Sequence, residues 1–377
     1  EDARFGLATH YGRIAFPYIF FISLAALLSG VLNATGRFRA AAAAPVLLNV
    51  IFIAALLIGA ATLPEAPSTT TGIDPRDLHI GSWLSWAVPV AGIAQLTLVW
   101  QAASLAGFRL RVSRPRLTPE LKRLAVIAAP AALAGGVVQI NLLIGRQVAS
   151  FFDGAVVWLS LADRLYQLPL GVVGVAIGVV LLPDLSRRLG AGDETGGRDA
   201  LNRAAEMALL LTVPAAVALA AIPGPLVSVL FERGTFTSED TAATALAVAI
   251  YGFGLPAFVL QKVLQPLFFA REDTRRPFHY ALVALLINAA VAIGLAPVLG
   301  YIAAAIGTTI AGWGMVWFLW RGSRGMGAAS QPDSRLLRRT GGIVAASLVM
   351  GAALFAAAWA LDPWLSGGSL RYAALAL

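Results

Sequence analysis

Ten apolar stretches of this sequence are each long enough to cross a lipid bilayer as a helix. They lie near residues 14–34, 41–62, 83–106, 124–144, 155–183, 204–222, 241–261, 278–298, 302–320 and 340–361. An eleventh stretch begins near residue 372 and is truncated by the end of the chain. Strands of a membrane barrel would read instead as alternating segments of about ten residues. The chain is therefore predicted to be an all-α polytopic membrane protein.

The composition agrees with this prediction. Hydrophobic residues make up 58% of the chain, charged residues 13%, and the mean hydropathy is +0.77. Soluble domains carry about 25% charged residues. The absence of cysteine excludes disulfides and thiolate metal sites, and the three histidines are too widely separated for a local metal motif. We expect no metal and no cofactor.

The positive charges alternate between successive loops. Of the 28 Lys and Arg residues, 21 lie in one set of alternate loops and six in the other, while Arg164 lies within a stretch. Such a split is what the positive-inside rule predicts, with residue 1 outside and the 107–123 loop inside. Because the net charge of +8 follows from this topology, nucleic acid is not expected as a partner. The basic loops are expected to face anionic lipid.

The stretch 155–183 carries two adjacent charges, Asp163 and Arg164. A charge at the centre of a membrane helix costs roughly 2.5–3.5 kcal/mol on insertion scales, so it usually faces a wet cavity or a partner. Pro169 follows and is expected to kink the helix. Three glycines come next and would let a neighbour approach closely: Gly171, Gly174 and Gly178. This combination favours a helix that lines a polar pathway.

A second interpretation of the same charges stays open. The run from Leu165 to Pro183 is nearly a full span by itself, so Arg164 can lie at the interface and extend its charge to water. The same snorkelling role is expected for Arg146 and Lys262, which follow the predicted spans closely.

An internal repeat suggests two lobes. At a constant offset of 239 residues, matching residues pair as Pro17 with Pro256, Arg37 with Arg276 and Asn49 with Asn288. Both units run from outside to inside, which is the parallel repeat of transporters with a cavity between lobes. The expected organisation is the last three spans of an N-terminal lobe at 1–106, a linker at 107–123, a six-helix C-terminal lobe at 124–320, a flexible basic linker at 321–339 and extra helices at 340–377.

Side-chain amides recur within the predicted spans, at Asn49, Gln95, Gln139, Asn141, Gln261 and Asn288. Most are expected to form interhelical hydrogen bonds, worth about 0.6 kcal/mol each. Four of them are also predicted as secondary residues of a substrate cavity: Asn141, Gln139, Asn49 and Asn288.

Several of these stretches resemble the MurJ (MviN-like) family of bacterial lipid II flippases. The resemblance rests on residues 16–38, 44–49, 162–187, 230–241 and 268–277, among them ADRLYQLPLGVVGVAIGVVLLPDLSR and LFERGTFTSEDT. It implies the multidrug/oligosaccharidyl-lipid/polysaccharide exporter fold, a bundle of two six-helix lobes around a central cavity. Family members have fourteen spans, so the resemblance also implies a fragment that begins at the fourth.

The resemblance implies a function as well. The cargo would be lipid II, an undecaprenyl-pyrophosphate-linked disaccharide-pentapeptide, moved to the outer leaflet of the bacterial inner membrane by alternating access. Arg164 matches the family's essential cavity arginine, with Asp163 beside it, so both are predicted to bind substrate. Partners would be the lipid bilayer and cell-wall synthesis proteins. The protein would be a transporter and not an enzyme.

Other functions fit parts of the sequence. A flippase for another polyprenyl-linked glycan fits the same chemistry. A drug or ion antiporter of the same fold needs protonatable acids within its spans, and Asp163 is the one good candidate. A membrane-embedded enzyme would need clustered acids or histidines, whereas the acids here are isolated or lie in loops.

Overall fold

The computed structural model describes residues 3–35, 37–62, 75–108, 118–119, 122, 136–137 and 139–365. Throughout this part of the chain the regular structure is helical, which confirms the predicted all-α class. Eight of the described helical segments are long and apolar enough to cross a membrane. They are Phe5–Asn33, Arg39–Ala61, Leu78–Leu105, Glu194–Ala221, Ser238–Phe269, Arg275–Leu299, Ile302–Ser323 and Ala328–Leu361.

Each of these segments coincides with a predicted span, and most begin earlier or end later than predicted. The predicted span at 155–183 coincides with one continuous helix, Ala155–Gly190. Most of the predicted span at 124–144, and the truncated stretch near 372, lie outside the described residues.

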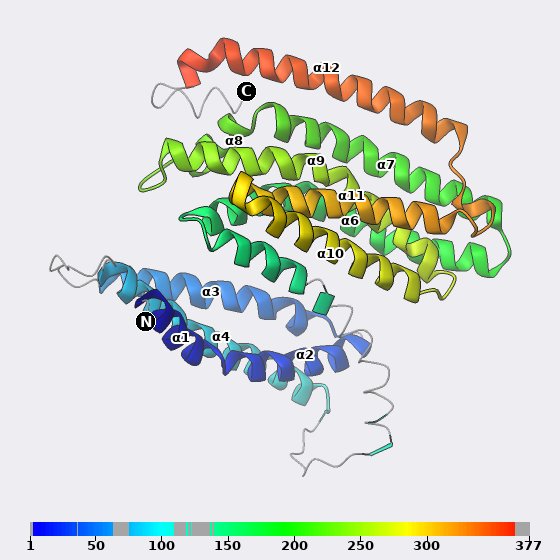
Figure 1. Ribbon diagram of the computed structural model, residues 1–377. Helices are drawn as coiled ribbons and strands as arrows, with labels where there is room; N and C mark the ends of the chain where they lie inside the picture. Colours follow the sequence, from blue (N-terminus) through cyan, green and yellow to red (C-terminus); the bar gives the residue numbers. More distant parts are fainter. Residues whose placement is uncertain are drawn as a thin grey trace. The chain divides into compact units, whose positions relative to one another are not determined.

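The chain divides into two compact units, residues 1–117 and 118–377. The first unit contains α1 (Ala3–Ala15), α2 (Tyr18–Ala34), α3 (Arg39–Ala61) and α4 (Pro75–Leu105). Helix α4 packs against the other three (Figure 1). The Gln95 amide of α4 donates a 2.8 Å hydrogen bond to the Ala44 carbonyl of α3, which confirms the interhelical role expected of it. Pro17 lies at the break between α1 and α2.

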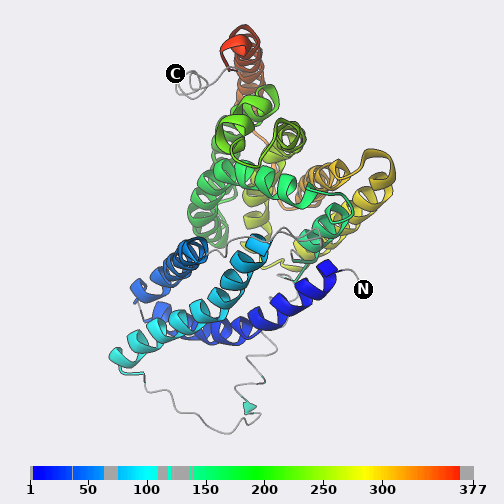
Figure 2. The ribbon, with the colours of Figure 1, turned by 90° about the vertical axis from the view of Figure 1, so that its left-hand side faces the viewer.

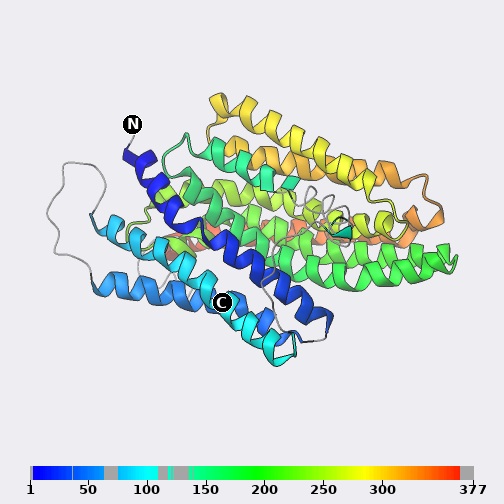
Figure 3. The same cartoon turned by 90° about the horizontal axis from the view of Figure 1, so that it is seen from below.

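The second unit contains helix 139–149, α6 (Ala155–Gly190), α7 (Glu194–Ala221), α8 (Pro223–Phe231), α9 (Ser238–Phe269), α10 (Arg275–Leu299), α11 (Ile302–Ser323), the 3-10 turn η1 (Ala328–Ser330) and α12 (Ser334–Leu365). Helix α9 lies at the centre, in contact with α6, α7, α8 and α11. Helices α10 and α11 run side by side (Figure 3). Figure 2 views these helices nearly end-on, with α12 at the edge of the unit next to α7.

Small residues allow α9 to take the central position. A Cβ added at Gly252 would lie 3.2 Å from the Ala216 carbonyl oxygen and 3.1 Å from the Leu219 Cβ of α7, so glycine is needed for this close approach. Four large apolar side chains of α9 are completely buried: Leu255, Val259, Val263 and Leu267. The core of the unit therefore forms around this helix.

The outside of the second unit is apolar. Large side chains that point away from the core include Phe253, Leu286, Val298, Val349, Phe355 and Trp359, each more than 60% exposed. An aqueous protein rarely exposes so much apolar surface, whereas the hydrocarbon of a bilayer covers it without cost. The surface thus supports the multi-pass membrane assignment.

The segment 321–339 is not the flexible linker predicted from its sequence. Glu206 of α7 pairs with Arg203, and with Arg335 and Arg339 of α12 at 3.3 and 2.5 Å. The prediction was wrong because composition shows the basic residues of this segment but not the carboxylate that they meet from another helix.

A second carboxylate fixes the preceding turn. Glu194, at the start of α7, accepts a 2.7 Å hydrogen bond from Arg271 and a 3.0 Å hydrogen bond from the Ala329 amide of η1. Helix α7 therefore holds both η1, through Glu194, and the start of α12, through Glu206.

Candidate functional site

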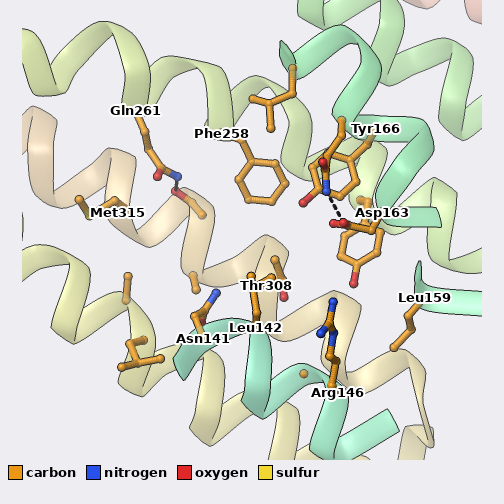
Figure 4. A pocket seen from close by; sticks show the side chains of 18 of the residues that line it. Asn141, Leu142, Arg146, Leu159, Asp163, Tyr166, Phe258, Gln261, Thr308 and Met315 are labelled. Carbon is orange, nitrogen blue, oxygen red and sulfur yellow. Dashed lines mark hydrogen bonds between the residues drawn. The ribbon is translucent and has the colours of Figure 1, made fainter. Parts of the chain in front are cut away.

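A cavity of about 700 Å³ lies within the second unit, between helix 139–149, α6, α9, α10 and α11 (Figure 4). Its wall mixes apolar side chains with amides, hydroxyls and charged groups. The predicted pair, Asp163 and Arg164, lies in this wall on α6. Arg164 is solvent-exposed there and Asp163 is half-buried.

Two further cations line the same cavity. Arg146 extends into it from helix 139–149 (Figure 4), and Lys262 joins it from α9. Both residues were expected near the ends of their spans, at 144 and 261. Arg146 lies in the last turn of its helix, which ends at Ala149, whereas Lys262 lies well inside α9, which continues to Phe269. The snorkelling role expected for both stays a prediction.

A signal for Lys262 was present in the sequence. Gln261, Lys262 and Gln265 are polar residues at successive positions of one helix face, and all three line the cavity. Residues three or four positions apart, such as Lys262 and Gln265 or Gln261 and Gln265, are neighbours on the surface of an α-helix. For Arg146 the sequence gives no such signal, because the residues four and three positions before it, Leu142 and Leu143, are apolar.

Asp163 is held by a neutral group. Its carboxylate accepts a hydrogen bond from the Gln167 amide, one turn along α6 (Figure 4). Within the described part of the chain, no ion pair joins Asp163 to Arg164. The two adjacent residues thus have different surroundings, and the guanidinium is left available.

An aromatic cluster supports the turn that carries Asp163. The Tyr166 ring lies 5.0 Å from the Tyr251 ring and 5.4 Å from the Phe258 ring, both of α9, measured between ring centroids. Both tyrosines are buried, with 9% and 7% of their surface exposed. Aromatic pairs at these separations are worth about 0.5–1.5 kcal/mol beyond the burial of their surface. This contact fixes α6 against α9 where the charges lie.

The predicted amides divide into different environments. Asn141 lines the cavity, and its Oδ1 accepts a 2.6 Å hydrogen bond from the Nδ2 of the buried Asn288 on α10. Gln139 is exposed and is not among the cavity residues, and Asn49 is an exposed residue of α3 in the first unit. Gln261 donates a 3.0 Å hydrogen bond to the Gly312 carbonyl of α11. The interhelical role is thus confirmed for Asn141, Asn288 and Gln261.

The chemistry of the cavity suits an anion with polar substituents. Among its described residues are three cations and one carboxylate, together with four amide side chains. No cluster of three or more His, Asp or Glu residues suited to a metal ion occurs in the described part of the chain.

Comparison with known proteins adds independent findings. The family described as "Lipid II flippase MurJ" matches residues 1–374. A "Probable lipid II flippase MurJ" of Rhizobium meliloti is 44% identical over 383 residues, covering 100% of this chain and 68% of that protein. A protein of the same description from Rhizobium tropici is 42% identical, covering 98% of this chain and 67% of that protein. The chain therefore spans about two thirds of the length of these relatives.

Solved structures are similar in fold. The structure titled "Lipid II flippase MurJ, inward closed conformation" superposes with a TM-score of 0.74 at 24% identity, covering 94% of this chain and 68% of that one. A crystal structure of a mutant of the Vibrio cholerae MATE transporter VcmN has a TM-score of 0.58 at 17% identity, covering 88% of this chain and 73% of that one. These likenesses show the exporter fold.

Proposed function

We propose a function from one premise: this chain belongs to the lipid II flippase MurJ family. In our proposal, the protein moves lipid II from the inner to the outer leaflet of the bacterial inner membrane. It works by alternating access and catalyses no covalent step. Lipid II joins a polyprenyl tail to a disaccharide-pentapeptide through a diphosphate, so any carrier must shield a charged headgroup from hydrocarbon.

The observation that carries this proposal is the position of Arg164. Its guanidinium lies in the wall of a cavity inside a helix bundle, without an ion-pair partner among the described residues. A guanidinium stays charged in any accessible environment and can bond two phosphate oxygens in a fork. We assign Arg164 the role of holding the diphosphate of the cargo.

Asp163 has a complementary role in the proposal. In the present structure its carboxylate accepts a hydrogen bond from Gln167, which leaves Arg164 available to an anion. When the cavity changes state without cargo, Asp163 can exchange this partner for Arg164 and neutralise it. Asn141, which faces the cavity, is assigned to the polar part of the headgroup.

The proposed topology follows the distribution of Lys and Arg. Residue 1 lies on the periplasmic side, and the 107–123 and 321–339 segments lie on the cytoplasmic side. The two compact units correspond in this proposal to the end of one lobe and to a complete second lobe with additional helices. Cell-wall synthesis proteins are proposed as further partners.

Translocation of labelled lipid II by the full-length protein tests this function. Substitution R164K keeps the charge but removes the fork, and should slow translocation at least tenfold if two oxygens are bound. The matched control is R321K, at the exposed end of α11, which should translocate normally. Wild-type translocation by R164K would contradict the role of the guanidinium.

A further inference from the structure

The cavity in the second unit carries more positive charge than one arginine supplies. Its described wall contains Arg146, Arg164 and Lys262 against the single carboxylate of Asp163, which is an excess of two positive charges. The carboxylate already accepts a hydrogen bond from Gln167. Within the described part of the chain, none of the three cations forms an ion pair. The excess is therefore not neutralised by these parts of the protein.

Such an arrangement is unfavourable for the empty protein. All three cations are solvent-exposed in the cavity, but like charges repel one another, and charges within a membrane bundle are costly unless water or a partner is present. Three helices nevertheless deliver one cation each to the same cavity: helix 139–149, α6 and α9. An anion with more than one negative charge would remove the repulsion and would bring these helices together.

The aliphatic stem of Lys262 packs against Gly174 of the facing helix, α6. A Cβ placed on Gly174 of α6 would lie 3.6 Å from the Lys262 Cγ, in ordinary van der Waals contact. Gly174 is buried, whereas Gly171 has nothing within 4 Å of a Cβ added to it. The stem of Lys262 therefore lies beside Gly174, and a side chain larger than a methyl group would displace it. Of Gly171 and Gly174, the latter makes this contact, and the side-chain surroundings of Gly178 lie outside the description.

The contact with Gly174 also fixes where Lys262 lies relative to Arg164. Gly174 follows Arg164 by ten residues, almost three turns of helix. The ammonium and the guanidinium therefore approach the cavity from different depths along α6. Ten residues of α-helix rise about 15 Å, so the two long side chains must extend toward each other to share one ligand, and a second phosphate group shortens the gap that they must close.

We propose that Lys262 and Arg146 bind the diphosphate together with Arg164, and that Lys262 makes the site prefer a diphosphate to a monophosphate. A diphosphate esterified at both ends carries one negative charge on each phosphate, so its charge is divided between two groups, as the positive charge of the wall is divided between separate cations. The inference rests on the proposed function, because it concerns the same cavity and the same cargo.

Equilibrium binding to the full-length protein tests the inference, with undecaprenyl diphosphate and undecaprenyl phosphate as probes. Each of K262Q and R146Q should weaken diphosphate binding about tenfold, the loss expected for one hydrogen bond to a charged group. K262Q should weaken monophosphate binding much less, so the preference for the diphosphate falls. The control is K122Q, which removes the other lysine of this chain at an exposed position outside the cavity. It should bind both probes as the wild type does.

Two variants of α6 keep the Lys262 ammonium but test its position. In G174L the new side chain occupies the space where the stem of Lys262 lies, so the preference for the diphosphate should fall. In G171L the new side chain meets open space, so the preference should not change. K262R should retain most of the preference, because it keeps a cation at the same position of α9.

Two different failures can be told apart. Wild-type diphosphate preference in both K262Q and G174L would overturn the inference and leave the proposed function standing. A wild-type protein that binds undecaprenyl diphosphate no better than the uncharged polyprenol would overturn both.

Discussion

The Nδ2 of Asn288 donates a 2.6 Å hydrogen bond to the Oδ1 of Asn141, linking α10 to helix 139–149. Asn288 is 1% exposed, whereas Asn141 lines the cavity. The buried Asn288 therefore orients the Asn141 amide, and this hydrogen bond holds helix 139–149, which carries Arg146, in the cavity wall.

Substitution N288A should destabilise the protein. It removes a buried interhelical hydrogen bond and leaves a small void, which together should lower the free energy of unfolding by about 1–2 kcal/mol. Thermal unfolding in detergent measures this loss. Q139A is the matched amide control, because Gln139 is exposed, and its effect should stay within about 0.5 kcal/mol. Equal effects of the two variants would show that the hydrogen bond contributes nothing.

The sequence predicts the outline of this fold well, because the length and hydropathy of a membrane helix are local properties. Helix ends are less accurate, since polar residues can continue a helix past its apolar stretch. Lys262 is the example: the apolar run ends at residue 261, but α9 continues to Phe269. Asp163 and Arg164 were found because two charges within an apolar run are visible in the sequence, whereas the partner of Asp163 required the three-dimensional structure.

Segment 321–339 illustrates a different limit. Its Arg335 and Arg339 read as loop charges, yet both bind Glu206, about 130 residues earlier in the chain. No local pattern indicates which distant carboxylate a basic segment will meet. Pairings of this kind depend on how helices pack and cannot be predicted from composition.

The contact between α7 and α9 gives a second prediction. In G252A, the new methyl group meets the Ala216 carbonyl oxygen at 3.2 Å, and backbone atoms cannot move aside as a flexible side chain can. Overpacking of this kind should lower the free energy of unfolding by about 1–3 kcal/mol. G294A in α10 is the control, because nothing lies within 4 Å of its added Cβ. It should be neutral or slightly stabilising, since alanine is the better helix former. A destabilisation of G294A as large as that of G252A would contradict the close-packing argument.

The attachment of α12 gives a third prediction. E206Q removes the charge shared by Arg203, Arg335 and Arg339, so the start of α12 should open more often. Amide hydrogen exchange over residues 334–340 should rise by about tenfold or more, as expected for the loss of hydrogen bonds between charged groups. E239Q, an exposed acid in the first turn of α9, should leave that exchange unchanged. Unaltered exchange in E206Q would mean that Glu206 does not hold the start of α12.

The account depends most on a wet cavity in which Arg164 meets a diphosphate. Ser160 lies one turn before Arg164 on α6 and lines the same cavity. With S160C as the single cysteine of the full-length protein, a water-soluble thiol reagent should label this position. Undecaprenyl diphosphate should protect it, and the added substitution R164Q should abolish most of that protection. Absence of labelling, or protection of equal strength in the R164Q background, would contradict the central claim.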